Sequence, residues 1–65
     1  WTLARMPIID LIVLRIAIFE LKSRPDVPTA VILNEAVELA KTFSTDESGR
    51  FVNGILSTIA KKVRQ

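Results

Sequence analysis

The segment from Pro7 to Lys22 is apolar on every side of a helix, and this constrains the fold more than any other feature of the sequence. The segment is too long for a β-strand, although its many β-branched residues would favour one. A helix without a polar face must be surrounded, and two short neighbours cannot cover it fully. We therefore expect further helices, or a second subunit, to pack against it. Its apolar residues are Ile8, Ile9, Leu11, Ile12, Val13, Leu14, Ile16, Ala17, Ile18, Phe19 and Leu21.

Proline and serine residues divide the chain into three helical segments. Pro7 and Pro28 suit a first helical turn, where the missing N–H has no partner to lose. Pro25 disfavours helix for the residue before it, so the first helix should end near Ser23. The third helix should begin near Ser44, which we expect to act as its cap in a capping box with Glu47. The predicted helices are about 7–22, 28–43 and 45–63, and the fold class is all-α.

The composition excludes several function classes. The chain has 65 residues, without cysteine or histidine, so no disulfide can form and the usual metal sites are nearly excluded. A net charge of +2 is too small to indicate nucleic-acid binding by itself. No apolar run approaches the roughly 20 residues needed to span a membrane. The serines lack a basic partner and no glycine-rich phosphate loop occurs, so we expect no enzyme activity, metal or cofactor.

The chain does not begin with Met, and we interpret it as part of a longer protein. A domain of this size buries only about 60% of the surface that its unfolded chain exposes, so it is marginally stable alone. The absence of cysteine fits a reducing compartment, and we expect a cytoplasmic location.

Three motifs follow one another in register: LRIAIFEL at 14–21, DVP at 26–28 followed by NEAVELAK at 34–41, and FVNGIL at 51–56. Together they resemble the C-terminal half of the NusB family of bacterial transcription antitermination factors. The resemblance implies that residues 1–65 form the three-helix C-terminal subdomain of a NusB-like helical bundle. The family's arginine-rich start and N-terminal helical bundle are missing from this chain, so we expect it to bind RNA poorly by itself.

The resemblance also implies a function and partners. Members of the family bind boxA RNA in rRNA leader transcripts together with NusE, a protein of the small ribosomal subunit. They act in the RNA polymerase antitermination complex and catalyse no reaction. This implies a non-enzymatic, RNA-binding adaptor that does not enter the membrane.

Individual residues match functional positions of the family. Glu47, Arg50 and Phe51 match the RNA-contacting end of the third helix, where Arg50 could hold a phosphate and Phe51 could stack on a base. Glu47 could accept hydrogen bonds from a base edge. Glu47 is also explained as a capping residue, and Phe51 as a core residue. Asp10 matches an acidic position at the NusE interface, although an acidic residue in a first helical turn also complements the helix dipole.

Four further residues are predicted to have structural roles. Arg15 lies among apolar neighbours, and a buried charge must be paired, so we expect an ion pair with Glu35 on the second helix. Asn53 and Gly54 are poor helix formers inside the third helix. We expect Gly54 to allow close approach of another helix, and Asn53 to satisfy backbone groups of a loop.

Two alternatives to an antitermination factor remain open. NusB-like helical domains also resemble the N-terminal region of bacterial rRNA cytosine methyltransferases, where this chain would be an RNA-binding accessory domain. A linker and a methyltransferase domain after Gln65 would favour that interpretation. The other alternative is a homodimer that forms through the uncovered first helix, which a size measurement in solution would test.

Overall fold

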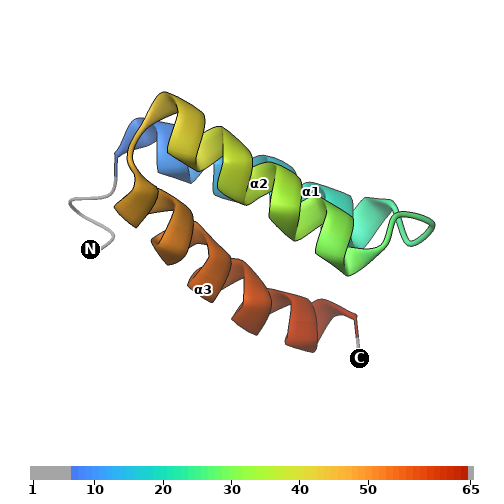
Figure 1. The fold of residues 1–65 in the computed structure, drawn as a ribbon. Helices are drawn as coiled ribbons and strands as arrows, with labels where there is room; N and C mark the ends of the chain where they lie inside the picture. The colour runs from blue at the N-terminus through green and yellow to red at the C-terminus, as the bar shows by residue number, and fades with distance from the viewer. Residues whose placement is uncertain (1–6, 65) are drawn as a thin grey trace.

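A computed structural model describes residues 7–64, and within them every regular element is an α-helix. Helix α1 spans Ile8–Ser23, α2 spans Thr29–Phe43 and α3 spans Asp46–Val63. Each helix packs against the other two, with α1 and α2 side by side and α3 lying beneath them (Figure 1). The all-α prediction is confirmed, and each predicted helix end lies within one residue of the observed one.

Small and branched side chains form the core where the three helices meet. Alanine contributes at four of these positions, and its small side chain lets the helix backbones approach closely. Branched side chains fill the remaining space, and each fully buried one contributes about 1.5–3 kcal/mol. The core consists of Val13, Leu14, Ala17, Leu21, Ile32, Ala36, Ala40, Val52, Leu56 and Ala60.

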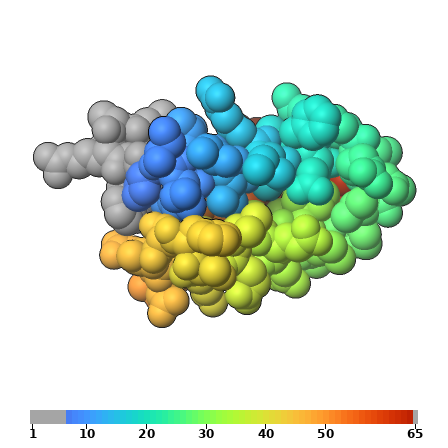
Figure 2. All heavy atoms as spheres, turned by 90° about the horizontal axis from the view of Figure 1, so that it is seen from above, coloured from blue at the N-terminus to red at the C-terminus, as the bar shows by residue number. Residues whose placement is uncertain are grey.

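Helix α1 buries only the side that faces α2 and α3. Large apolar side chains on its other side are 41–71% exposed, namely Ile8, Leu11, Ile12, Ile16 and Phe19. This confirms the prediction that two short neighbours cannot cover α1 fully. Figure 2 shows this side of α1 lying next to α2 on one continuous surface.

The side chain of Arg64, which directly follows α3, forms hydrogen bonds to residues in and beside the connection between α1 and α2. Its guanidinium donates hydrogen bonds to the backbone oxygens of Leu21 (3.0 Å), Val27 (2.5 Å) and Arg24 (2.7 Å), and to the hydroxyl of Thr29 (3.2 Å). One side chain thus joins residues that are 35 to 43 positions away in sequence. Inspection of the sequence did not suggest this role.

The predicted ion pair between Arg15 and Glu35 is wrong. Both side chains are exposed, and among residues 7–64 the ion pair that forms is instead Arg24 with Asp26, at 3.5 Å. The reason is the rotation of about 100° per residue in a helix. Ile16 lies beside Glu35 in a hollow between α1 and α2, and Arg15, one residue earlier, therefore points away from α2. Because Arg15 reaches solvent, its charge needs no partner.

The predicted structural roles of Asn53 and Gly54 are also wrong. Both residues are exposed on α3. Apart from the backbone of α3 itself and the neighbours of Gly54 in sequence, no atom of residues 7–64 lies within 4 Å of the position that a Cβ on Gly54 would occupy, so no other described helix approaches closely there. The Asn53 side chain has no hydrogen-bond partner within the described part of the chain. The two residues face solvent because the buried stripe of α3 runs through Val52 and Leu56.

None of the helices within residues 7–64 has the length and apolar character needed to cross a membrane.

Candidate nucleic-acid interface

The candidate interface begins at the turn that joins α2 to α3. Thr45 caps α3, because its hydroxyl oxygen accepts a hydrogen bond from the backbone N–H of Ser48 at 3.0 Å. The prediction that Ser44 is the cap is therefore wrong. The backbone N–H of Ser44 donates to the carbonyl of Ala40 at 2.9 Å, so Ser44 closes α2 instead.

Hydrogen bonds among the hydroxyl groups of Ser44, Thr45 and Ser48 stabilise this turn. Ser48 is fully buried, and its hydroxyl lies 2.9 Å from that of Ser44. The hydroxyl of Thr45 donates to the same Ser48 oxygen at 3.2 Å. The first turn of α3 is thus held in place by short polar side chains, and Glu47 is not needed as a capping residue.

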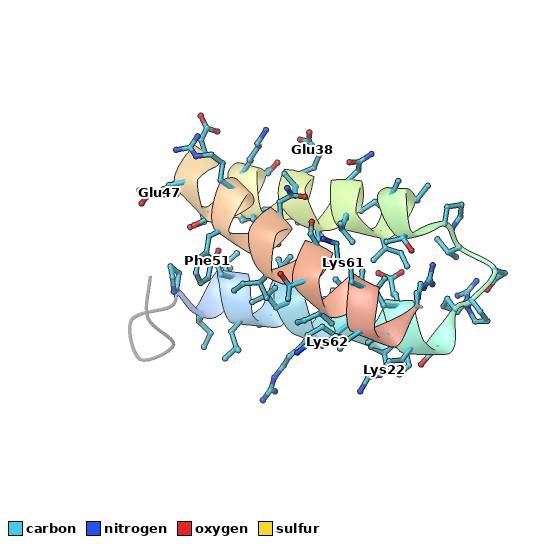
Figure 3. The ribbon with its side chains drawn as sticks, turned by 90° about the horizontal axis from the view of Figure 1, so that it is seen from below. Lys22, Glu38, Glu47, Phe51, Lys61 and Lys62 are labelled. Carbon is cyan, nitrogen blue, oxygen red and sulfur yellow. The ribbon has the colours of Figure 1, made fainter. Side chains whose placement is uncertain are left out.

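Glu47, Arg50 and Phe51 lie together on the first two turns of α3, as positions three and four residues apart do on a helix. Glu47 and Arg50 are exposed, and neither forms a hydrogen bond or ion pair within residues 7–64. Phe51 is half-buried and has interactions of its own. Figure 3 shows Glu47 at the outer tip of α3 and Phe51 on the side that faces the start of α1.

Lys41 and Gly49 belong to the same region, although sequence inspection did not single them out. A Cβ on Gly49 would lie 2.7 Å from Cγ and 3.2 Å from Cε of Lys41, so the lysine stem lies directly over this buried glycine. Because Gly49 has no side chain, the stem of Lys41 can pack directly against the first turns of α3. The sequence signal that could have indicated this contact is a glycine one turn after Thr45, the residue that caps α3 in the structure.

Asp10 lies in the first turn of α1, as predicted, and its side chain is fully buried. Within residues 7–64, neither carboxylate oxygen of Asp10 has a hydrogen-bond partner. A partner protein cannot reach this carboxylate from the surface as the chain is folded here. Burial of an unpaired carboxylate costs free energy, so Asp10 lowers the stability of the first turn of α1.

The arrangement is suited to binding a ligand at the surface. This end of the bundle offers two exposed cations, Arg50 on α3 and Lys41 on α2, and the first turn of α3 adds the acidic residues Asp46 and Glu47. Cations with a partly exposed aromatic ring can contact phosphates and the face of a base. Among the described residues, no group of acidic side chains is arranged to hold a metal ion.

A second group of cations lies far from this region. Lys22 is in the last turn of α1, and Lys61 and Lys62 are in the last turn of α3. Figure 3 shows them at the opposite end of the bundle from Glu47. Their placement is explained by the negative end of each helix dipole, which cations stabilise.

Comparison with known proteins identifies the family. Residues 1–61 match the model of the NusB family, which is most of the chain. The chain belongs to the NusB family. No solved structure matches it.

Curated relatives carry the name transcription antitermination protein NusB. The NusB of Citrifermentans bemidjiense is 56% identical over 63 residues, which are 97% of this chain and 43% of that protein. The NusB of Saccharopolyspora erythraea is 61% identical over 61 residues, or 92% and 41%. The NusB of Lysinibacillus sphaericus is 52% identical over 62 residues, or 95% and 49%. The chain therefore spans less than half the length of these relatives.

Proposed function

We propose that this chain is part of a NusB-type transcription antitermination factor, a non-enzymatic adaptor that acts in the bacterial cytoplasm. In this proposal it binds boxA RNA of rRNA leader transcripts together with NusE, within the RNA polymerase antitermination complex. Membership of the NusB family and the names of the relatives support this function.

The RNA-binding part of the proposal rests on one observation about Glu47 and Arg50: neither side chain forms a hydrogen bond or ion pair within residues 7–64. Thr45 and Ser48 cap α3 without help from Glu47, and Arg50 is exposed without an ion pair among the described residues. Side chains that are not used by the fold are available to a ligand. Arg50 would bind a phosphate, and Glu47 would accept hydrogen bonds from the edge of an unstacked base.

The local charge implies that the contact is weak without a partner. Arg50 and Lys41 attract phosphates, whereas Asp46 and Glu47 repel them. Each phosphate neutralised on a single strand contributes a salt dependence of about 0.7 in the logarithmic slope. Two cations therefore give a shallow salt dependence, and NusE is proposed to supply the remaining affinity.

Asp10 is proposed to take part only after a local rearrangement. Its buried carboxylate lacks a donor, so opening of the first turn of α1 would remove an unfavourable interaction. A donor group of NusE could then pair with Asp10 at the end of the bundle where α3 begins.

Fluorescence anisotropy of labelled boxA RNA tests the proposal directly. The chain is titrated into the RNA with and without NusE, and an RNA of scrambled sequence serves as the comparison. We expect Arg50→Ala to weaken binding by about fivefold to tenfold and to lower the salt slope by roughly 0.7.

Arg24→Ala is the matched control, because Arg24 is also an exposed cation but lies in the α1–α2 connection at the far end of the bundle. Its substitution should change the affinity by less than twofold. Equal effects of the two substitutions, or no preference for boxA over the scrambled RNA, would contradict the proposal.

A further inference from the structure

The side chain of Lys41 packs on a glycine of the neighbouring helix. A Cβ on Gly49 would lie 2.7 Å from Cγ, 3.2 Å from Cε and 3.5 Å from Cδ of Lys41. The lysine stem therefore occupies the space that a side chain at position 49 would fill, and Gly49 is buried while Lys41 stays exposed. Long cationic side chains pack in this way, with the stem on the protein and the charged end in water.

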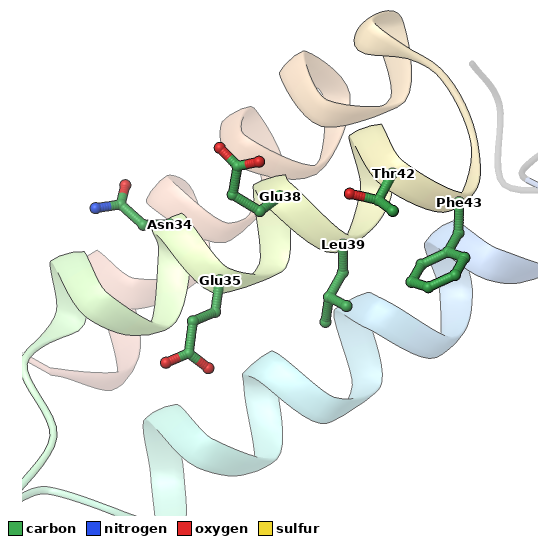
Figure 4. A pocket seen from close by; sticks show the side chains of 6 residues that line it. All are labelled: Asn34, Glu35, Glu38, Leu39, Thr42 and Phe43. Carbon is green, nitrogen blue, oxygen red and sulfur yellow. The ribbon is translucent and has the colours of Figure 1, made fainter.

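Lys41 is unpaired although acidic residues are close to it along the chain. Glu38 lies three residues before it on α2, a spacing at which opposite charges pair on a helix, and Asp46 is in the first turn of α3. Figure 4 shows Glu38 projecting from α2 away from α1, so that helix does not engage it. Lys41 nevertheless forms no ion pair or hydrogen bond within residues 7–64. Its contact with Gly49 thus leaves the ammonium group without an anion.

Packing of the lysine stem also restricts where the charge can be. A freely rotating lysine side chain has many rotamers, and a ligand that immobilises it must offset the lost conformational entropy. The stem of Lys41 is already confined at three carbons by the surface of α3, so less of this entropy is lost on binding. Placing a binding group in advance raises affinity for this reason.

We propose that Gly49 is a positioning residue that holds Lys41 in place as a contact for a phosphate of single-stranded RNA. Arg50 follows Gly49 by about 100° around α3, so Lys41 and Arg50 are exposed on adjacent sides of the first turns of this helix. Two such cations can bind neighbouring phosphates of a strand that crosses the helix. The inference rests on the proposed RNA-binding function and adds to it the residue that places the second cation.

Two substitutions separate the charge of Lys41 from its position. Lys41→Met keeps a stem that packs on Gly49 and removes the charge, whereas Gly49→Ala keeps the charge and displaces the stem. In fluorescence anisotropy with labelled boxA RNA and NusE, each should weaken binding about threefold to fivefold and lower the salt slope by roughly 0.7. Gly54→Ala is the matched control, because a Cβ there meets nothing outside its own helix within residues 7–64, and it should change the affinity by less than twofold.

The double variant shows whether Gly49 acts through Lys41. If it does, Lys41→Met combined with Gly49→Ala should bind the RNA as well as Lys41→Met alone, because no charge is left to displace. Additive losses would overturn the positioning role, since Gly49 would then act independently of Lys41. Circular dichroism of each variant shows whether the helices are retained.

NMR tests the packing without any substitution, and it decides the question should Gly49→Ala fail to fold. Nuclear Overhauser effects between the side-chain protons of Lys41 and the α-protons of Gly49 are expected in the free chain. Their absence would overturn the positioning role.

Arg50→Ala in the same assay distinguishes failure of this inference from failure of the proposed function. If Arg50→Ala weakens binding and Gly49→Ala does not, RNA binding by α3 stands and positioning by Gly49 is overturned, whatever the effect of Lys41→Met. If none of the three substitutions weakens binding, the RNA contact at the start of α3 is overturned as well.

Discussion

Substitution of Arg64 by Ala should destabilise the whole bundle. The side chain makes four hydrogen bonds to the end of α1, the connection that follows it and the start of α2, three of them to backbone oxygens. A hydrogen bond from a charged group contributes about 1.5–3 kcal/mol when buried. This region is partly exposed, and water can replace some of the lost donors. We therefore expect a loss of about 2–4 kcal/mol rather than the full sum.

Such a loss is large for a chain of this size. At about 0.05–0.15 kcal/mol per residue, the free energy of unfolding should be roughly 3–10 kcal/mol. Arg64→Ala would remove a large part of it. Arg64→Lys should recover only about 1 kcal/mol, because an ammonium group cannot reach acceptors spread around a planar guanidinium.

Urea denaturation followed by far-UV circular dichroism measures this effect. With a slope near 1 kcal/mol per molar urea, the midpoint should fall by about 2–4 M and the slope should not change. Arg50→Ala is the control, since Arg50 is exposed without a partner in the described chain, and it should shift the free energy by less than about 0.5 kcal/mol. Equal stability of the two variants would refute the role given to Arg64.

Three further predictions concern single residues. Gly54→Ala should stabilise the chain by about 1 kcal/mol, because nothing lies near the new Cβ and alanine favours a helix; an unchanged or lower Tm would contradict this. Asp10→Ala should raise the free energy of unfolding by about 1–2 kcal/mol, because it removes a buried carboxylate without a donor; a loss of stability in urea denaturation would show that Asp10 is paired. The pKa of Asp26 lies below 3.8, mainly because the Arg24 side chain donates a hydrogen bond to it. Since the folded-state pKa is the lower one, the stabilisation from Asp26 is present above pH 3.8 and is lost as the pH falls through the folded-state pKa. In an NMR titration, Arg24→Ala should raise the midpoint toward 3.8.

The helices could be predicted because their signals are local. Pro7, Pro25 and Pro28 mark the limits of α1 and the start of α2, and apolar spacing identifies α2 and α3. The choice between Ser44 and Thr45 as the cap of α3 could not be made from sequence. Both have a suitable hydroxyl, and the outcome depends on the Ser44 N–H, which is already used to close α2.

Contacts between distant residues could not be predicted from sequence. Arg15 was expected to be buried because its neighbours are apolar, but α2 and α3 leave that side of α1 open. Arg64 appears in the sequence as one more cation at a helix end, whereas the structure gives it four acceptors from a distant connection. Burial of Asp10 depends equally on how α1 packs.

The candidate interface was predicted only through the family resemblance. Glu47 and Arg50 form no pattern that by itself indicates RNA binding, and a net charge of +2 gives no guidance. The contribution of Lys41 depends on its position over Gly49, which requires the angle between α2 and α3. Local spacing thus predicts the helices, and the packed structure is needed to find which charged side chains remain available.

The most direct test of the account is an NMR titration of the isotopically labelled chain with boxA RNA in the presence of NusE. If the start of α3 contacts RNA, the amide signals of Lys41 and of residues 47–51 should shift most when the RNA is added to the complex. Larger shifts around Lys61 and Lys62, or no shift at residues 47–51, would contradict an RNA contact at the start of α3.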